Sequence, residues 1–452
     1  MLSIVILTVV ATVVLYLGFT QYKNVIIPFA VTGIVLVLFC LLTNQSLWNN
    51  WFMNMMDIQG SSKIFSVLIV GTTGCLLPFI NLFRQRGAEE VADFTGILLY
   101  AIIGGMMMVS YSDLMVLFLG VEILSIAMYI LAGASRKRVA SNEASMKYFL
   151  LGSFASAILL YGIALYYTST GSFRLDIGNS GQSALLNLSY LLLFAGLSFK
   201  IALVPFHFWA PDVYQGTPTI FTATMATVVK ISAVGALYQF IRYCGVNMSD
   251  WLFWLISLTA IASILIGNIM AVTQHSVKRL LAYSGIVQAG FIIISFLNFD
   301  PKDSWIILYY LVAYTLASLV TFLGTHFIEE VSGTDDHSAF KGLYYNNPFL
   351  AVVMSVALIS LGGGPLTAGF MAKFFVLSHA ATAGNMALVV LALILAVISL
   401  YYYFRIINAM FSRTNDTRNW EIHWTYRGIF AILSLVTLAA GIAPYWLVNL
   451  LK

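Results

Sequence analysis

Four ionisable side chains lie inside long apolar stretches of the sequence: Glu122, Lys200, Lys230 and Lys373. A charged group at the centre of a membrane helix costs roughly 2.5–3.5 kcal/mol on insertion scales, so it is usually kept for function. Burial disfavours the charged form of lysine and carboxylate alike, which brings both groups toward proton exchange near neutral pH. The pattern therefore predicts a proton relay in which Glu122 controls the charge of Lys200.

Other interpretations of these four residues are open at this point. A lysine near the end of a span can extend its ammonium to the interface, and a Glu–Lys pair can be purely structural. Neither reading accounts for Lys230, which lies deep in the segment 217–240, and one acid cannot pair with three lysines. A site for an organic solute would show more hydrogen-bonding side chains than these stretches contain.

The composition explains why four buried charges stand out. The chain has 452 residues, of which 60% are hydrophobic and 9% charged, with a formal net charge of +4. Its mean hydropathy is +0.91. Soluble domains usually carry about 25% charged residues. These values exclude a soluble enzyme, a disordered protein and a nucleic-acid binder, and they indicate a multi-pass membrane protein.

The apolar windows predict an all-α membrane protein with about 14 transmembrane helices, because each crossing needs about 20 apolar residues. The predicted spans are 1–18, 25–43, 64–83, 94–111, 114–133, 146–167, 184–204, 217–240, 251–270, 278–298, 304–328, 347–378, 386–410 and 428–449. Most lysines and arginines fall in the loops of one side, including the run at 136–138. That side should be cytoplasmic, which places both termini outside the cytoplasm of a bacterial inner membrane.

Two of the predicted helices, the seventh and the twelfth, are discontinuous. Pro205 and Pro211 interrupt the first, just after Lys200, and the run Gly362–Pro365 interrupts the second, ahead of Lys373. Paired breaks in corresponding places indicate an inverted repeat with a transport pathway. An offset of five helices reverses the orientation of the second unit. We therefore expect one membrane domain, 1–452, with helices 1–3 in 1–93, repeats in 94–240 and 251–410, and helix 14 in 428–449.

Several stretches of the chain carry a family resemblance. They are VEILSIAMYIL, MKYFLLGSFASAILLYGIALYY, FKIALVPFHFWAPDVYQGTPT, ATVVKISAVGAL, VKRLLAYSGIVQAGF and GGPLTAGFMAKFF. Together they resemble the antiporter-like membrane-arm subunits of respiratory complex I, the proton-pumping NADH–quinone oxidoreductase. Lys373 at the twelfth-helix position and the short C-terminal end fit the subunit N type best.

The resemblance implies a role for each buried charge. Glu122 looks like the fifth-helix glutamate that pairs with the seventh-helix lysine, here Lys200. Lys230 looks like the central lysine of the eighth helix, and Lys373 looks like the exit-side group of the twelfth. Protons would be taken up from the cytoplasm, load Lys230, pass to Lys373 and leave outward, driven by quinone reduction elsewhere in the complex.

The sequence also departs from the family pattern. Ser276 stands where an acid or amide is common, Gly285 replaces a serine, and Gln288 takes the place of a frequent histidine. Because glutamine cannot titrate, we expect the path to rely on water or on nearby hydroxyl groups. The candidate accessory residues are His207, Asp212, His275, Tyr283, Ser284, Tyr310 and Tyr314. His207 and Asp212 can equally serve as a loop clamp, His275 as a helix cap, and the tyrosines as packing residues.

Neither a metal site nor a redox site is expected on this chain, because Cys40, Cys75 and Cys244 are isolated and lack ligand spacing. NADH, FMN, iron–sulfur clusters and quinone would bind other subunits, and the expected neighbours are subunits M, K and J. Glu329-Glu330 and Asp335-Asp336 are interpreted as an acidic loop, either solvated or touching a neighbour.

Three alternatives remain for the function. The first is a subunit of a multisubunit Na⁺/H⁺ antiporter or of a membrane-bound hydrogenase, which shares the expected fold and charges. The second is a scaffold subunit with an inactive channel, and the third is a solute transporter.

Overall fold

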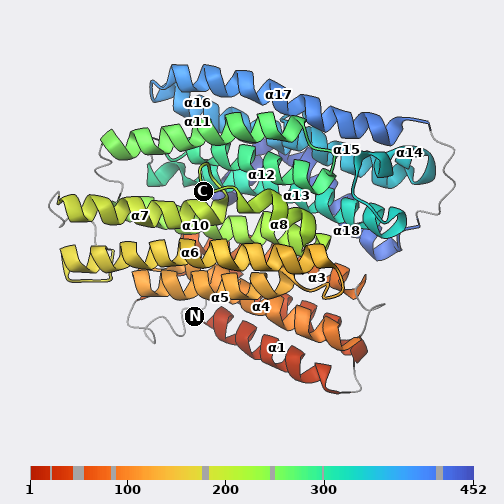
Figure 1. The fold of residues 1–452 in the computed structure, drawn as a ribbon, viewed down its shortest axis with the longest axis horizontal. Helices are drawn as coiled ribbons and strands as arrows, with labels where there is room; N and C mark the ends of the chain where they lie inside the picture. Colours follow the sequence, from red (N-terminus) through yellow and green to blue (C-terminus); the bar gives the residue numbers. More distant parts are fainter. Residues whose placement is uncertain are drawn as a thin grey trace. The chain divides into compact units, whose positions relative to one another are not determined.

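The computed structural model describes residues 2–20, 23–43, 55–82, 88–175, 183–244, 250–297, 300–413 and 421–452. In these ranges the backbone forms helices and a few isolated β-bridges, with no strand (Figure 1). The chain divides into two compact units. Unit 1 comprises Met1–Ile201 and Gly216–Ser249, and unit 2 comprises Ala202–Gln215 and Asp250–Lys452.

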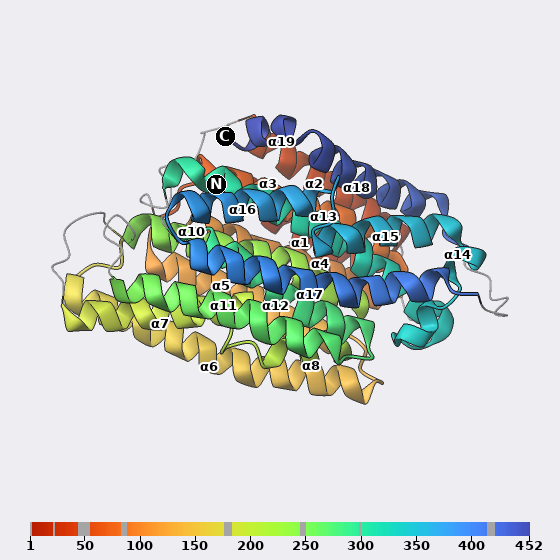
Figure 2. The ribbon, with the colours of Figure 1, turned by 90° about the horizontal axis from the view of Figure 1, so that it is seen from above.

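Among the described residues, unit 1 contains nine α-helices, which are α1 to α10 without α8. Its α-helices are α1 (Leu2–Gly18), α2 (Ile26–Leu42), α3 (Ser61–Ile80), α4 (Ala88–Ser110), α5 (Leu114–Ala132), α6 (Val139–Thr170), α7 (Ala184–Ile201), α9 (Thr219–Thr224) and α10 (Lys230–Cys244). A 3-10 turn, η1 (Lys23–Val25), precedes α2, and a π-helical segment, η3 (Met225–Val229), joins α9 to α10. In both ribbon views α6 lies along α7 (Figures 1 and 2).

Unit 2 contains the helix after the first break and the C-terminal half of the chain. Its α-helices are α8 (Trp209–Gly216), α11 (Asp250–Val272), α12 (Val277–Ile294), α13 (Ser304–Ser332), α14 (Leu343–Asn346), α15 (Pro348–Gly362), α16 (Ala368–Thr382), α17 (Met386–Phe411), α18 (Trp424–Ile442) and α19 (Pro444–Leu451). Two 3-10 turns, η5 (Pro301–Asp303) and η6 (His337–Phe340), precede α13 and α14. Inside this unit α11 packs along α12, and α13 packs against α15, α16 and α18.

The described residues include 11 helices that are long and apolar enough to cross a membrane. Three further predicted spans correspond to shorter apolar helices: Leu2–Gly18, Ile26–Leu42 and Pro348–Gly362. Each predicted apolar window thus contains helix among its described residues, although 347–378 is divided between α15 and α16. The boundaries move by several residues, since α6 begins before 146 and α16 continues past 378. The apolar windows located the helices well because their length and hydropathy are properties of composition alone.

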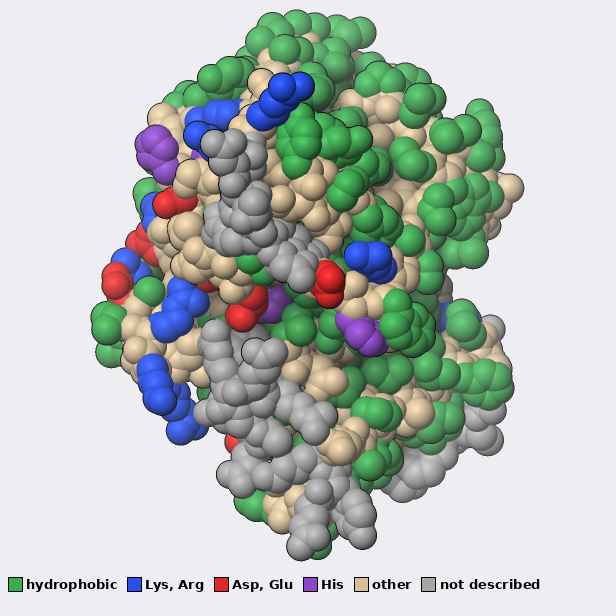
Figure 3. Space-filling model, turned by 90° about the vertical axis from the view of Figure 1, so that its right-hand side faces the viewer, with side chains coloured by type: hydrophobic (Ala, Val, Ile, Leu, Met, Phe, Trp, Pro, Cys, Tyr) green, Lys and Arg blue, Asp and Glu red, His purple; other side chains and the backbone are tan. Residues whose placement is uncertain are grey.

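Charged side chains gather on the face that Figure 3 shows. The face in Figure 3 carries lysine, arginine, acidic and histidine side chains toward its left, and apolar side chains cover most of its right. The long helices expose apolar residues such as Phe154, Leu393 and Val397. This distribution is typical of helices that face lipid along their length and water at their ends.

Both predicted helix breaks are present, although one proline has a different place. α7 ends at Ile201, ahead of Pro205, whereas Pro211 lies in the first turn of α8. The prediction that Pro211 interrupts the helix was therefore wrong, because proline is tolerated in a first turn, where no intrahelical donor is lost. The second break separates α15 from α16 over residues 363–367.

The two breaks share an unusual backbone. Among the described residues, the non-glycine residues with positive φ are Ala202 (64°) and Leu366 (67°), one in each break. Left-handed backbone at such residues costs roughly 1–2 kcal/mol and persists where the surrounding packing enforces it. The packing around each break therefore enforces its conformation, and neither break is a frayed helix end.

Candidate functional site

Lys200 lies in a cage of side chains from three helices of unit 1. It is 3% exposed in the last turn of α7. Its ammonium donates to Ser125 Oγ at 2.7 Å and to Tyr129 OH at 3.5 Å, both on α5. The rings of Tyr129 and of Tyr148, on α6, lie 5.6 and 6.0 Å from the ammonium. Hydroxyl groups and ring faces both stabilise an ammonium, so the cage can hold this lysine charged.

Glu122 lies one turn before Ser125 on the same helix, close enough to Lys200 for electrostatic interaction. Among the described residues no ion pair joins the two groups, because Lys200 donates to Ser125 instead. The Oε1 atom of Glu122 is buried and has no hydrogen-bond partner there. An unsatisfied buried carboxylate oxygen is costly, so this oxygen is available to a water or a moving ammonium.

Lys230 follows directly after the π-helical segment η3 and is 3% exposed. π-helical turns are rare and occur mostly as single bulges, frequently at functional sites. Residues 219–241, which surround this lysine in the chain, are all buried. Its side chain therefore cannot extend to a lipid interface, which removes the snorkelling interpretation for Lys230.

Lys373 lies on α16 of unit 2, is 7% exposed and points back at the break. Its ammonium donates to the carbonyls of Leu361 (3.2 Å) and Gly362 (2.8 Å), the last residues of α15, and lies 5.0 Å from the ring centre of Phe291. Carbonyls at a helix C-terminus carry partial negative charge and lack intrahelical donors. The broken helix thus supplies the ligands of this lysine.

A hydrogen-bonded cluster extends from Lys373 into unit 2. Gln288 Nε2 donates to the same carbonyl, Leu361, at 2.7 Å, and Tyr310 OH donates to Gln288 Oε1 at 2.5 Å. Ser284 Oγ lies 2.5 Å from Tyr403 OH, which the sequence did not single out. Of the predicted hydroxyl groups, Ser284 and Tyr310 belong to this cluster, while Tyr283 and Tyr314 are buried nearby in sequence on α12 and α13.

The residues of the first break form a clamp within unit 2. Arg279 Nη1 donates to Asp212 Oδ1 at 2.6 Å and to Gln215 Oε1 at 3.2 Å, and so fixes α8 to the start of α12. His207 is 6% exposed and lies 4.4 Å, centre to centre, from the ring of Phe208. This geometry favours the clamp interpretation for Asp212.

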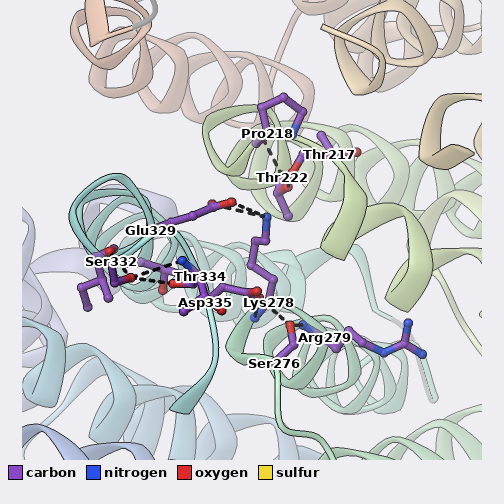
Figure 4. Close-up of polar contacts among 12 residues, drawn as sticks. Thr217, Pro218, Thr222, Ser276, Lys278, Arg279, Glu329, Ser332, Thr334 and Asp335 are labelled. Carbon is purple, nitrogen blue, oxygen red and sulfur yellow. Dashed lines mark hydrogen bonds and ion pairs between the residues drawn. The ribbon is translucent and has the colours of Figure 1, made fainter. Parts of the chain in front are cut away.

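A buried ion pair that the sequence did not reveal lies at the start of α12. Lys278 is 1% exposed, and its ammonium lies 3.4 Å from both carboxylate oxygens of Glu329, whose side chain is 13% exposed. Asp335 accepts from Lys278 N at 3.2 Å and from Ser276 Oγ (Figure 4). The interpretation of 329–336 as a solvated acidic loop was therefore wrong for Glu329 and Asp335. Their partner Lys278 is hidden because, in the sequence, it looks like an ordinary orienting charge in a loop.

Loop segments around His275 are joined at the same end of unit 2. His337 N donates to the His275 carbonyl at 3.1 Å, while the His275 side chain is exposed. Arg405, on α17, donates to His337 Nε2 at 2.6 Å and to the Val272 carbonyl at 3.0 Å. Burial and the Arg405 guanidinium lower the pKa of His337 to about 4. His275 thus contributes through its backbone, in agreement with a structural role.

Metal ligands do not converge anywhere in the described part of the chain, where no group of three His, Cys, Asp or Glu side chains could hold an ion. Cys40 and Cys75 are free thiols, and the side chain of Cys244 lies outside the described residues. The chemistry available at the sites above is proton binding by lysine, glutamate and hydroxyl groups.

Comparison with known proteins gives a consistent family match. A family model described as NADH:quinone oxidoreductase/Mrp antiporter, TM, matches residues 111–399. NADH-quinone oxidoreductase subunit N of Flavobacterium johnsoniae is 38% identical over 448 residues, covering 96% of both chains. A chain of respiratory complex I from Thermus thermophilus superposes with a TM-score of 0.85 at 32% identity, covering 100% of this chain and 99% of that one. A chain of an archaeal membrane-bound sulfane sulfur reductase shares the fold, with a TM-score of 0.89 at 22% identity and coverage of 100% and 95%.

Proposed function

Because this chain belongs to the NADH:quinone oxidoreductase/Mrp antiporter transmembrane family, we propose that it is the subunit N type membrane component of a proton-translocating NADH–quinone oxidoreductase. It is an antiporter-like translocase subunit, and the redox reaction that drives it takes place on other subunits. NADH, FMN, iron–sulfur clusters and quinone are bound there. This chain contributes the proton-conducting groups.

The observation that carries this proposal is the burial of Lys200, Lys230 and Lys373, which are 3%, 3% and 7% exposed. A purely structural subunit has no need for three such lysines, each of which weakens insertion. In the proposed relay a proton from the cytoplasm loads Lys230, passes to Lys373 and leaves on the outer side. The Glu122–Lys200 contact sets the timing: when Lys200 turns from Ser125 to Glu122, its charge is held, and when it turns back, the proton is released more easily.

The proposed membrane topology follows from the same premise. Fourteen transmembrane helices place both termini outside the cytoplasm of a bacterial inner membrane. Helices 4–8 and 9–13 form two inverted repeats, 94–240 and 251–410, in one membrane domain. The positive φ of Ala202 and of Leu366 supports this pairing, since corresponding helices carry corresponding breaks. Subunits M, K and J are the proposed neighbours in the membrane arm.

The decisive experiment replaces Lys230 in the intact complex. Lys230→Ala should lower the proton-to-electron ratio of quinone-dependent pumping in inverted vesicles, while the complex still assembles. Lys147→Ala is the matched control, because Lys147 is 41% exposed and pairs with Glu143 at 2.8 Å on the surface of α6. The pair is local, at positions i and i+4 of α6. Full pumping stoichiometry in Lys230→Ala would refute the proposed relay and favour a scaffold subunit.

The competing function is a subunit of a multisubunit Na⁺/H⁺ antiporter, which the description of the matched family also names. It predicts that the native assembly lacks NADH-oxidising subunits and moves protons against a sodium gradient without electron transfer. Purification of the native complex, followed by identification of its subunits, separates the two functions.

A further inference from the structure

A histidine–carboxylate pair lies at the end of unit 2 beyond Lys373. His379 Nε2 is 3.3 Å from Asp303 Oδ2, and the two side chains are 17% and 40% exposed. His379 follows Lys373 by six residues on α16, a rise of roughly 9 Å at 1.5 Å per residue. Past Lys373, His379 is the one histidine, acid or base among the described side chains of α16.

The two ring nitrogens of His379 have different surroundings. Nε2 faces the half-exposed carboxylate of Asp303, whereas Nδ1 is buried and has no hydrogen-bond partner among the described residues. A buried ring nitrogen without a partner is uncommon and indicates a place for a water or an incoming proton. In the neutral ring with its proton on Nε2, Nδ1 is an acceptor.

We propose that His379 and Asp303 form the outer release group of the relay, which takes up a proton at Nδ1 and gives one up at Nε2. Neutral His379 accepts the proton that leaves Lys373, carried by water, and becomes an imidazolium paired with Asp303. The Nε2 proton then passes by way of Asp303 to the outer solvent. The ring then carries its proton on Nδ1. Transfer of that proton from Nδ1 to Nε2 through water restores the starting tautomer, so over the cycle one proton enters and one leaves.

The side chains around the His379–Asp303 pair suit the release of a proton rather than its storage. The rings of Trp305 and Tyr309 pack on Phe375, which lies between Lys373 and His379 in the chain, with 5.1 Å between ring centres in each pair. The charged groups at this end are Asp300, Lys302 and Asp303 near η5 and Lys452 after α19, whose ammonium lies 5.4 Å from the Trp305 ring. The described ends of α12, α15, α17 and α18 at this side contribute no titratable side chain.

The inference rests on the proposed function, since it needs Lys373 to deliver a proton and this end of unit 2 to face outward. The alternative is that the pair merely fastens η5 to α16. A fastening role affects assembly and thermal stability, whereas a release role makes pumping depend on the pH of the compartment that receives the protons. The two roles therefore differ in a measurable pH profile.

The test uses the whole complex in inverted vesicles, where pumped protons enter the lumen and the lumenal pH can be set. His379→Gln should lower the initial pumping rate by about a hundredfold, the lower end of what a positioned proton-transfer group contributes. Asp303→Asn should change the dependence of pumping on lumenal pH, because the Nε2 proton loses the carboxylate that accepts it. The control is His423→Gln: His423 is exposed, caps α18 and lies outside the relay, so pumping should be unchanged.

The outcomes separate the two proposals. Loss of pumping in Lys373→Met together with normal pumping and an unchanged lumenal pH profile in His379→Gln would overturn the release group alone. Normal pumping in Lys373→Met would overturn the proposed relay itself. If His379→Gln and Asp303→Asn lower the melting temperature but leave the pH profile of pumping unchanged, the pair only fastens η5 to α16.

Discussion

Lys200 and Lys373 each lie beside a broken helix, but their surroundings are of opposite kinds. Lys200 donates to the side chains of Ser125 and Tyr129, with Glu122 nearby. Lys373 donates to the main-chain carbonyls of Leu361 and Gly362. Side chains rotate at little cost, whereas carbonyls at the end of a packed helix are fixed. The first is a switchable site, whose contacts can change by side-chain rotation, and the second is a fixed site, whose contacts hold the lysine in one place.

The largest effect is expected when the fixed site loses its lysine. Lys373→Met should abolish proton transfer through this chain, because the carbonyls of α15 then have no cation to hold and no group to titrate. Quinone-dependent pumping in inverted vesicles measures the loss. Lys341→Met, an exposed lysine before α14, is the control and should pump normally. Equal pumping by the two variants would show that the fixed site is not on the proton path.

Lys278, another buried lysine, shows what direct pairing contributes, since neither Lys200 nor Lys373 forms an ion pair among the described residues. Lys278 lies 3.4 Å from Glu329. Removing one partner of a buried pair typically costs about 3–5 kcal/mol, because the other charge is left uncompensated. Lys278→Met should therefore lower the melting temperature of the complex strongly, and adding Glu329→Met should recover part of the loss.

The exposed pair Glu143–Lys147 provides the reference for that measurement. Lys147→Met should change stability by only about 0.5 kcal/mol or less, as for other helical i, i+4 pairs. A similar small effect for Lys278→Met would contradict the view that Lys278 depends on Glu329.

The fixed site also depends on one glycine in the second break. Gly363 has φ +85°, and a Cβ there would lie 2.9 Å from Lys373 Cδ. Gly363→Ala should cost roughly 1–2 kcal/mol for the left-handed backbone, and it should displace the lysine and lower pumping further. Gly384→Ala is the matched control, because Gly384 has φ +87° with open space around its Cβ position. If both alanines lower pumping equally, the contact with Lys373 is irrelevant and only the backbone matters.

The sequence predicted the parts of this architecture that depend on composition. Apolar length located the helices, and the Gly362–Pro365 run located the second break, because these features act within one segment. The four buried charges were visible for the same reason. The prediction for Pro211 was wrong. A proline can end a helix or lie in its first turn, and the sequence alone does not tell where the helix starts relative to the proline.

The parts that the sequence could not supply are contacts between segments far apart in the chain. Lys278 looked like an orienting charge until Glu329, on the next long helix, was found beside it. Tyr403 lies in a run of three tyrosines that could equally be packing residues, and only its 2.5 Å contact with Ser284 distinguishes it. The relay roles of Glu122, Lys200, Lys230 and Lys373 stay predictions until the variants are measured.

A smaller effect is expected at the switchable site, where water can replace a lost hydroxyl. Ser125→Ala removes the group to which Lys200 donates at 2.7 Å. A hydrogen bond to a charged group contributes about 1.5–3 kcal/mol. Lys200 should then turn toward Glu122, so pumping slows by a few fold without loss of assembly. Glu122→Gln should slow pumping more than Ser125→Ala does; the reverse order would indicate that Ser125, and not Glu122, controls this lysine.

The smallest effect is expected where Arg405, on α17, donates to His337. This contact is held in place like that of Lys373, but its acceptor, the His337 ring, can be titrated. Arg405 donates to His337 Nε2, so the ring is neutral there, and burial together with Arg405 lowers its pKa to about 4, below the ordinary value of about 6.5. Between pH 6.5 and 4 the unfolded loop binds a proton that the folded loop excludes. The stabilisation is therefore complete above pH 6.5 and falls as the pH drops toward 4. As the pH falls from 6.5 to 4, the hydrogen-exchange rate of residues 333–341 relative to the intrinsic rate should rise in the wild type. In His337→Gln, whose amide oxygen can still accept from Arg405, the rise should be absent, and an unchanged rise would exclude His337 as its source.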